Sequence, residues 1–156
     1  MTKKVAYFAY GANMSTGWLK RYVPSAKPLG HAKLLDKRLV CNKKSKDGSG
    51  KANLANSIGD AVWGVLYEID STELDKLDRV EGGYTRVRLD VITNQGSSIK
   101  AYVYISFELT DDARPHDWYK ELMVKGAREH QLPPFYMKYL EQIHSKPNPV
   151  KEGCHF

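Results

Sequence analysis

The residues of this chain best suited to chemistry lie in two short stretches, and the first is near the amino terminus. The strand-like run 5–10 leads directly into a turn, Gly11-Ala12-Asn13. A strand that stops at a glycine leaves backbone N–H groups without ladder partners, and glycine lets the chain curl so that such amides converge on an anion. This stretch therefore predicts a backbone site for a carboxylate or an oxyanion. A tight turn without a ligand, in which Asn13 only caps the turn, is the alternative.

The second stretch is Leu-Asp-Arg-Val-Glu-Gly-Gly-Tyr at 77–84, which contains the candidate acid–base residue Glu81. This glutamate is in or just after the last turn of a predicted helix, where the helix dipole disfavours a carboxylate. Aromatic walls around Glu81 would raise its pKa further and suit it to general acid–base work near neutral pH. A solvated glutamate beside a Gly-Gly turn is the alternative.

Three predicted helices in the second half of the chain would position these residues. The first, over 71–80, begins at Asp70 and Glu73, which have the spacing of a capping box. The other two helices are introduced by prolines and cover 115–129 and 135–144. The predicted inner face of the first helix is apolar: Leu74, Leu77 and Val80.

The remaining elements are predicted strands, which indicate an α+β fold with a curved or closed sheet. Segments with strand composition are 5–10, 32–41, 54–58, 61–69, 84–93 and 99–107. The last two alternate apolar and polar residues on either side of the turn 94–97, which predicts an antiparallel hairpin. Neither an internal repeat nor a linker is visible, so 1–156 is expected to be one domain.

Composition indicates an ordinary soluble domain. The 156 residues are 42% hydrophobic and 27% charged. No apolar run approaches the roughly 20 residues that span a membrane, and no signal peptide is visible, so a cytoplasmic protein without membrane contact is expected. Two cysteines, Cys41 and Cys154, are too few for a disulfide framework or a zinc site. The end of the chain, 153–155, is predicted to be a frayed tail.

The net charge of +6 raises nucleic acid as a possible partner, but no further feature supports it. Much of the basic surplus lies between Lys33 and Lys51, in a stretch expected to be an exposed, solvated loop. Paired Cys/His ligands, basic-region heptads and RNP-type aromatic motifs are all missing from the sequence. Nucleic acid is therefore not expected as the partner. A basic adaptor would show salt-sensitive binding through 33–51 and indifference to Glu81.

Four segments, in one order, resemble the γ-glutamylcyclotransferases, also described as AIG2-like. The matching residues are Tyr-Phe-Ala-Tyr-Gly-Ala-Asn-Met at 7–14, Val-Trp-Gly-Val-Leu-Tyr at 62–67, Leu77-Asp78-x-x-Glu81-Gly82, and Tyr119-Lys120 with Lys-Gly-Ala-Arg-Glu at 125–129 and Leu132-Pro133. The resemblance covers about residues 5 to 143. It implies a small mixed, largely antiparallel β-barrel flanked by helices, which agrees with the α+β fold indicated by the pattern.

The resemblance also implies a reaction: cyclisation of γ-glutamyl amino acids to 5-oxoproline with release of the free amino acid. No covalent nucleophile, metal or cofactor takes part, and Glu81 matches the glutamate that shuttles the proton. A monomer or homodimer acting on a small molecule is expected. The implied substrate-binding residues are Tyr7, Phe8, Ala9, Tyr10, Gly11, Ala12, Asn13, Tyr84 and Tyr119. Without the resemblance, core packing would be the favoured interpretation for Tyr84 and Tyr119, since the chain has ten tyrosines.

Two departures from the family pattern leave the substrate open. Ala12 stands where the family usually has serine, and the turn 81–84 is shorter than in some relatives. Relatives that open with Tyr-Gly-Thr-Leu favour γ-glutamylamines, so Tyr-Gly-Ala-Asn here favours γ-glutamyl amino acids. A cyclotransferase for γ-glutamylamines, an isopeptide lysine or a specialised γ-glutamyl metabolite is one alternative. A non-catalytic small-molecule-binding module on the same scaffold is the other, although it would have no need of Glu81.

Overall fold

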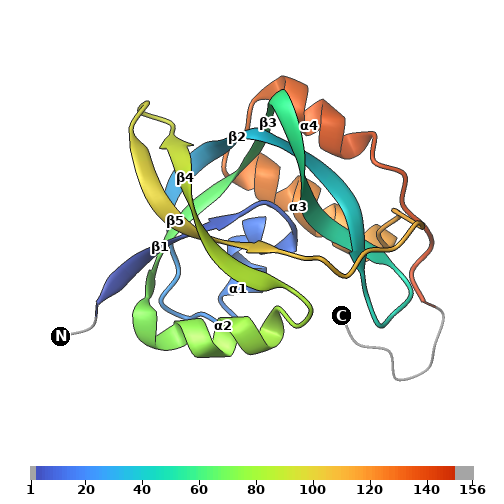
Figure 1. Ribbon diagram of the computed structural model, residues 1–156, viewed down its shortest axis with the longest axis horizontal. Coiled ribbons are helices and arrows are strands. Elements are labelled where there is room, and N and C mark those ends of the chain that lie inside the picture. The colour runs from blue at the N-terminus through green and yellow to red at the C-terminus, as the bar shows by residue number, and fades with distance from the viewer. Residues whose placement is uncertain (1–2, 150–156) are drawn as a thin grey trace.

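A closed barrel of five strands forms the centre of the computed structural model, which describes residues 3–149 (Figure 1). The strands are β1 (Lys4–Ala9), β2 (Lys27–Lys44), β3 (Gly50–Asp70), β4 (Thr85–Thr93) and β5 (Ser98–Ile105). Around the barrel they follow the order β1-β3-β2-β4-β5. The β1–β5 pair is parallel and the other pairs are antiparallel. The predicted α+β fold with a mixed, largely antiparallel barrel is thus confirmed.

Short helices connect and flank the strands. They are η1 (Ala12–Met14), α1 (Thr16–Leu19), η2 (Ser71–Glu73), α2 (Leu74–Val80), α3 (Asp117–Glu129) and α4 (Pro134–Glu141), where η marks a 3₁₀ turn. In Figure 1, α3 and α4 lie together on one side of the barrel and α2 crosses its lower end. Contacts of α3 with η1 join this helix layer to the turn that follows β1. No helix within 3–149 is long and apolar enough to cross a membrane.

The longest hairpin, β2–β3, corrects two of the strand predictions. Segments 54–58 and 61–69 are one strand, and β2 extends well beyond 32–41. Pairing continues through a register shift between Leu35 and Lys37, where Asp36 has a φ of 60°. A bulge can absorb extra residues without ending the ladder, so a break in the apolar pattern did not mark a break in the strand.

The predicted capping box at the start of the first helix is wrong. Asp70 makes no side-chain cap and forms an ion pair with Lys4. Glu73 accepts a hydrogen bond from the backbone N–H of Ser25 at 3.1 Å. The segment therefore begins as the turn η2, because the two carboxylates bind Lys4 and Ser25, which are distant in the sequence, instead of capping the helix. Leu74 and Leu77 are buried as predicted, but Val80 is 41% exposed.

The other predicted elements are confirmed to within a few residues. The hairpin of β4 and β5 has the expected antiparallel pairing. The proline-initiated helices are α3 and α4, although each is shorter than predicted. The predicted strand 99–107 ends earlier than expected, because Phe107 lies beyond β5 and is 78% exposed. Cys154 and the predicted frayed tail fall outside the described residues.

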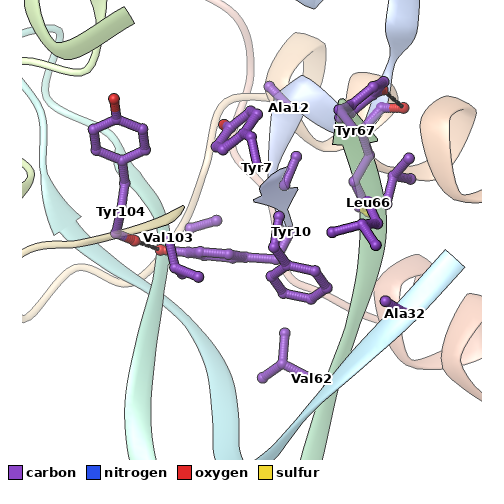
Figure 2. Packing of buried hydrophobic residues seen from close by; sticks show 14 of the residues in the cluster. Tyr7, Tyr10, Ala12, Ala32, Val62, Leu66, Tyr67, Val103 and Tyr104 are labelled. Carbon is purple, nitrogen blue, oxygen red and sulfur yellow. Dashed lines mark hydrogen bonds between the residues drawn. The ribbon is translucent and has the colours of Figure 1, made fainter. Parts of the chain in front are cut away.

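Buried tyrosines fill the barrel next to β1 and fix the turn that follows it. Tyr10 donates a hydrogen bond to the carbonyl of Tyr104, and Figure 2 shows its side chain extending across the interior to that strand. The Tyr67 hydroxyl lies 3.0 Å from the carbonyl oxygens of both Asn13 and Met14. Since Tyr67 is fully buried on β3, these contacts hold η1 against the barrel.

Candidate active site

The turn after β1 forms one wall of a cavity of about 280 Å³. Within this turn, the Met14 N–H donates to the carbonyl of Gly11 and the Ser15 N–H donates to the carbonyl of Ala12, both at 3.0 Å. The N–H groups of Gly11 and Asn13 donate to no acceptor among residues 3–149. Two unpaired amides beside a cavity are suited to an anion.

Glu81 reaches the same cavity from the end of α2. It is the C-cap residue of that helix, and its N–H donates to the carbonyl of Leu77 at 2.8 Å. Asn13 donates from Nδ2 to Glu81 Oε1 at 2.7 Å and to the Tyr7 hydroxyl at 2.9 Å. The two chemically suggestive stretches of the sequence are therefore joined by one buried amide.

The surroundings of Glu81 bring its pKa into the neutral range. Burial of the carboxyl raises the pKa to about 7, against an ordinary value of 4.5. The hydrogen bond from Asn13 and the nearby charges of Lys51 and Lys43 act in the opposite direction. Near neutral pH, the carboxyl can thus both accept and return a proton.

Two tyrosines form hydrogen bonds with the backbone of one β3 residue, Ala52, at the cavity wall. The Tyr84 hydroxyl donates to the carbonyl of Ala52 at 2.7 Å, while the Tyr119 hydroxyl accepts from the Ala52 N–H at 3.2 Å. Tyr84 has therefore committed its single proton to the protein, whereas the proton of Tyr119 stays available to a ligand. Gly11 allows this arrangement, because a Cβ there would lie 2.7 Å from the Tyr119 hydroxyl oxygen.

The cavity gathers all but one of the residues that the sequence suggested. Those that line it are Tyr7, Phe8, Tyr10, Gly11, Ala12, Asn13, Glu81, Tyr84 and Tyr119. Ala9 does not line it and is 2% exposed within the core. Its carbonyl packs against Gly64, where an added Cβ would lie only 2.3 Å from that oxygen.

Other lining residues were not anticipated from the sequence, and the basic ones correct the prediction of a solvated loop. They include Trp18, Arg21, Lys43, Lys51, Tyr104 and Trp118. Lys43 is on β2 and Lys51 on β3, and Lys43 is only 8% exposed. The sequence feature that could have revealed this is Asp-Gly-Ser-Gly at 47–50, which is typical of a hairpin turn and so places the flanking lysines on paired strands.

Comparison with known proteins assigns the chain to a family. Residues 61–140 match the AIG2-like family. The γ-glutamylcyclotransferase of Homo sapiens is 33% identical over 148 residues, which are 88% of this chain and 77% of that protein. This chain belongs to the γ-glutamylcyclotransferase family. The Bos taurus member is also 33% identical, over 93% of this chain and 80% of its own length.

The fold of the γ-glutamylcyclotransferase family is shared along nearly the whole chain. A solved structure of a γ-glutamyl cyclotransferase superposes with a TM-score of 0.88 at 30% sequence identity. It covers 96% of this chain and 93% of that one. A solved human protein, described as uncharacterized protein loc79017, gives the same TM-score at 31% identity. The resemblance seen in the motifs is therefore confirmed.

Removing the Asn13 amide should shift the titration of Glu81 to higher pH. In Asn13→Leu, a side chain of similar size lacks the donor that stabilises the carboxylate, so the pKa should rise above about 7. Carboxyl ¹³C chemical shifts of labelled glutamate report the midpoint, with the Glu81 signal assigned from Glu81→Gln. An exposed control is Asn56→Leu, which should leave the midpoint in place. An unchanged or lower midpoint in Asn13→Leu would contradict the assigned hydrogen bond.

The buried Glu81 carboxyl should also lower the free energy of unfolding at a pH above its pKa, where the group is charged. Between pH 4.5 and about 7 the folded protein retains a proton that the unfolded chain releases, so stability falls as the pH rises through this window. Glu81→Gln removes this cost and should be more stable than the wild type at pH 8, by about 1–3 kcal/mol. Denaturant unfolding at pH 8 and pH 4 measures the difference, which should vanish at pH 4. A less stable variant at pH 8 would refute the raised pKa.

Proposed function

We propose that this protein converts γ-glutamyl amino acids to 5-oxoproline and the free amino acid, with Glu81 moving the proton. The observation that best supports the proposal is the hydrogen bond from Asn13 to Glu81, which joins the glutamate carboxyl to the turn after β1 in one cavity. Membership of the γ-glutamylcyclotransferase family supports the reaction class. The substrate is a small molecule, and we place the enzyme in the cytoplasm as a monomer or homodimer.

The proposed reaction is an intramolecular acyl transfer. The Glu81 carboxylate takes a proton from the substrate's α-ammonium group, and the resulting amine attacks the γ-carbonyl carbon. A C–N bond forms and closes the five-membered ring, and the carbonyl oxygen becomes an oxyanion. Protonated Glu81 then gives the proton to the departing amine as the original amide C–N bond breaks. The ring nitrogen then gives its remaining extra proton to the Glu81 carboxylate, which passes it to the released amine. The products are a neutral lactam and an ammonium group on the released amino acid, and Glu81 ends as the carboxylate.

Orientation supplies much of the rate in this mechanism. Holding two reacting groups in attack geometry contributes up to roughly 7–11 kcal/mol in good intramolecular models. The amides of Gly11 and Asn13 offer a second contribution, by binding the glutamyl α-carboxylate or the oxyanion. One well-placed donor to an oxyanion is worth roughly 3 kcal/mol. Ala12 lacks the hydroxyl of the family's usual serine but keeps its backbone.

A pKa of about 7 suits Glu81 to both steps. An ordinary glutamate would hold its proton too weakly to protonate the leaving amine at neutral pH. Tyr119, whose hydroxyl proton is uncommitted among residues 3–149, is placed to donate to the substrate. In this proposal Tyr84 acts indirectly, by holding the Ala52 backbone that Tyr119 also contacts.

Product analysis with γ-glutamyl-alanine tests the proposed function. We expect 5-oxoproline and alanine in equal amounts, with no added cofactor. Release of glutamate would instead identify a hydrolase. Binding without turnover of γ-glutamyl-alanine, γ-glutamyl-ε-lysine and γ-glutamylamines would favour the binding-module alternative. Turnover confined to γ-glutamylamines would retain the reaction but change the substrate class.

A further inference from the structure

We propose that Lys43 and Lys51 bind the carboxylate of the leaving amino acid and thereby select γ-glutamyl amino acids over γ-glutamylamines. This inference rests on the proposed function and names the substrate class of the same site. Lys43 and Lys51 both line the cavity that contains Glu81. A γ-glutamyl amino acid carries two carboxylates, and only one of them can use the turn at Gly11 and Asn13.

Lys43 is a buried cation without an anionic partner. The residue is 8% exposed, and none of residues 3–149 forms a hydrogen bond or ion pair with its Nζ. The nearest described interaction is with the ring of Tyr84, whose centroid is 5.2 Å from Nζ. Gly83 makes room for the ammonium group, because a Cβ there would lie 2.9 Å from both Cε and Nζ. Burying an unpaired charge is costly, so this position favours an external anion.

Lys51 adds a second positive charge at the same place. It is the register partner of Lys43 across the β2–β3 hairpin, so the two side chains leave the same face of the sheet. Like charges in this position repel one another, and burial together with Lys51 lowers the pKa of Lys43. The Lys51 Nζ also lies 5.7 Å from the centre of the Trp118 ring. An anion between the two lysines would relieve the repulsion.

The nearby acidic residues do not neutralise this pair. Asp47 lies 3.8 Å from the Lys51 Nζ but also accepts hydrogen bonds from the Ser49 N–H and hydroxyl, at 3.0 and 2.6 Å. Glu81 and Glu108 affect the pKa of Lys43 but lie beyond ion-pair distance. Asp47 therefore engages Lys51 only, and no carboxylate among residues 3–149 lies within ion-pair distance of Lys43.

The position of these two lysines suits a leaving group that carries its own carboxylate. In a γ-glutamyl amino acid, one carbon separates that carboxylate from the amide nitrogen, so it stays close to the reacting centre. Lys43 and Lys51 are near enough to Glu81 to oppose the rise in its pKa. A γ-glutamylamine would leave the Lys43 ammonium group without an anionic partner and Lys51 with Asp47 alone. Buried polar groups without partners are the basis of strong discrimination.

The test compares γ-glutamyl-alanine with γ-glutamyl-alaninamide, which differ only in the terminal charge. The wild type should prefer the acid by roughly 10- to 100-fold in kcat/KM, as expected for charged hydrogen bonds. Lys43→Met and Lys51→Gln should each bring this ratio close to one. The control Lys44→Gln changes an exposed neighbour on the same strand and should keep the wild-type ratio.

The ratio separates substrate recognition from other roles of the lysines. If they only tuned Glu81 or supported the fold, both substrates would lose activity equally and the ratio would not change, which would overturn the proposal. Equal use of both substrates by the wild type would also overturn it. If Lys43→Met does not fold, the substrate ratio of Lys51→Gln tests the proposal by itself. Calorimetry of both compounds with Glu81→Gln measures the preference without turnover, so a charge preference in binding would survive even if the proposed reaction failed.

Discussion

Glu81→Gln should reduce kcat for γ-glutamyl-alanine by about a thousandfold, within the roughly 10²–10⁴ range of general acid–base catalysis. Glutamine keeps the size of the side chain and an oxygen for the Asn13 amide, but it cannot accept the proton of the α-ammonium group. Because the reacting groups would still be oriented, residual turnover above the uncatalysed reaction is expected. Steady-state release of 5-oxoproline at pH 8 measures the effect.

The matched control for this substitution is Asp75→Asn on the same helix. It also converts a carboxylate to an amide, but Asp75 is an exposed residue in the first turn of α2. This variant should retain wild-type kcat. A loss below tenfold in Glu81→Gln, with the fold intact by circular dichroism, would remove Glu81 from the proton transfer.

Gly126→Ala should cause a large loss of stability. A Cβ at this position of α3 would lie 2.3 Å from the carbonyl carbon of Met14 and 2.4 Å from the nitrogen of Ser15. Both atoms are backbone, so no side-chain rotation can relieve the clash. We expect a loss of about 3 kcal/mol or more. Activity should also fall, because the displaced turn carries Asn13.

Gly17→Ala provides the control for this second prediction. It adds the same methyl group on α1, where nothing lies within 4 Å of the new Cβ. Its stability should remain within about 1 kcal/mol of the wild type, since alanine is the better helix former. Denaturant unfolding of both variants measures the difference. Gly126→Ala within 1 kcal/mol of the wild type would contradict the close packing of α3 on η1.

Local sequence patterns were sufficient to predict most helices and strands, but not the partners that individual side chains find in the folded chain. Alternation and turn residues predicted the β4–β5 hairpin, because both depend on neighbours in the sequence. The capping-box prediction failed because Asp70 and Glu73 found partners at Lys4 and Ser25, which only the folded chain brings near. The long strand β3 was divided in two because a bulge interrupts its pattern.

The site could be predicted only in part, for the same physical reason. Composition alone left Glu81 as either a surface carboxylate or an acid–base group, and it was the family resemblance that connected it with Asn13. The two lysines were missed because charged residues near a glycine-rich turn are usually solvated. The register that turns Lys43 inward and Lys44 outward is set by the pairing of β2 with β3, which composition does not reveal.

The most direct test is a single-turnover measurement of 5-oxoproline formation from γ-glutamyl-alanine, with enzyme in excess, by the wild type and Glu81→Gln. This design isolates the chemical step from product release. The account predicts a wild-type rate that rises with pH around a midpoint near 7, set by Glu81, and a slow rate without that midpoint in the variant. Equal single-turnover rates for the two proteins would contradict the proposal that Glu81 carries the proton.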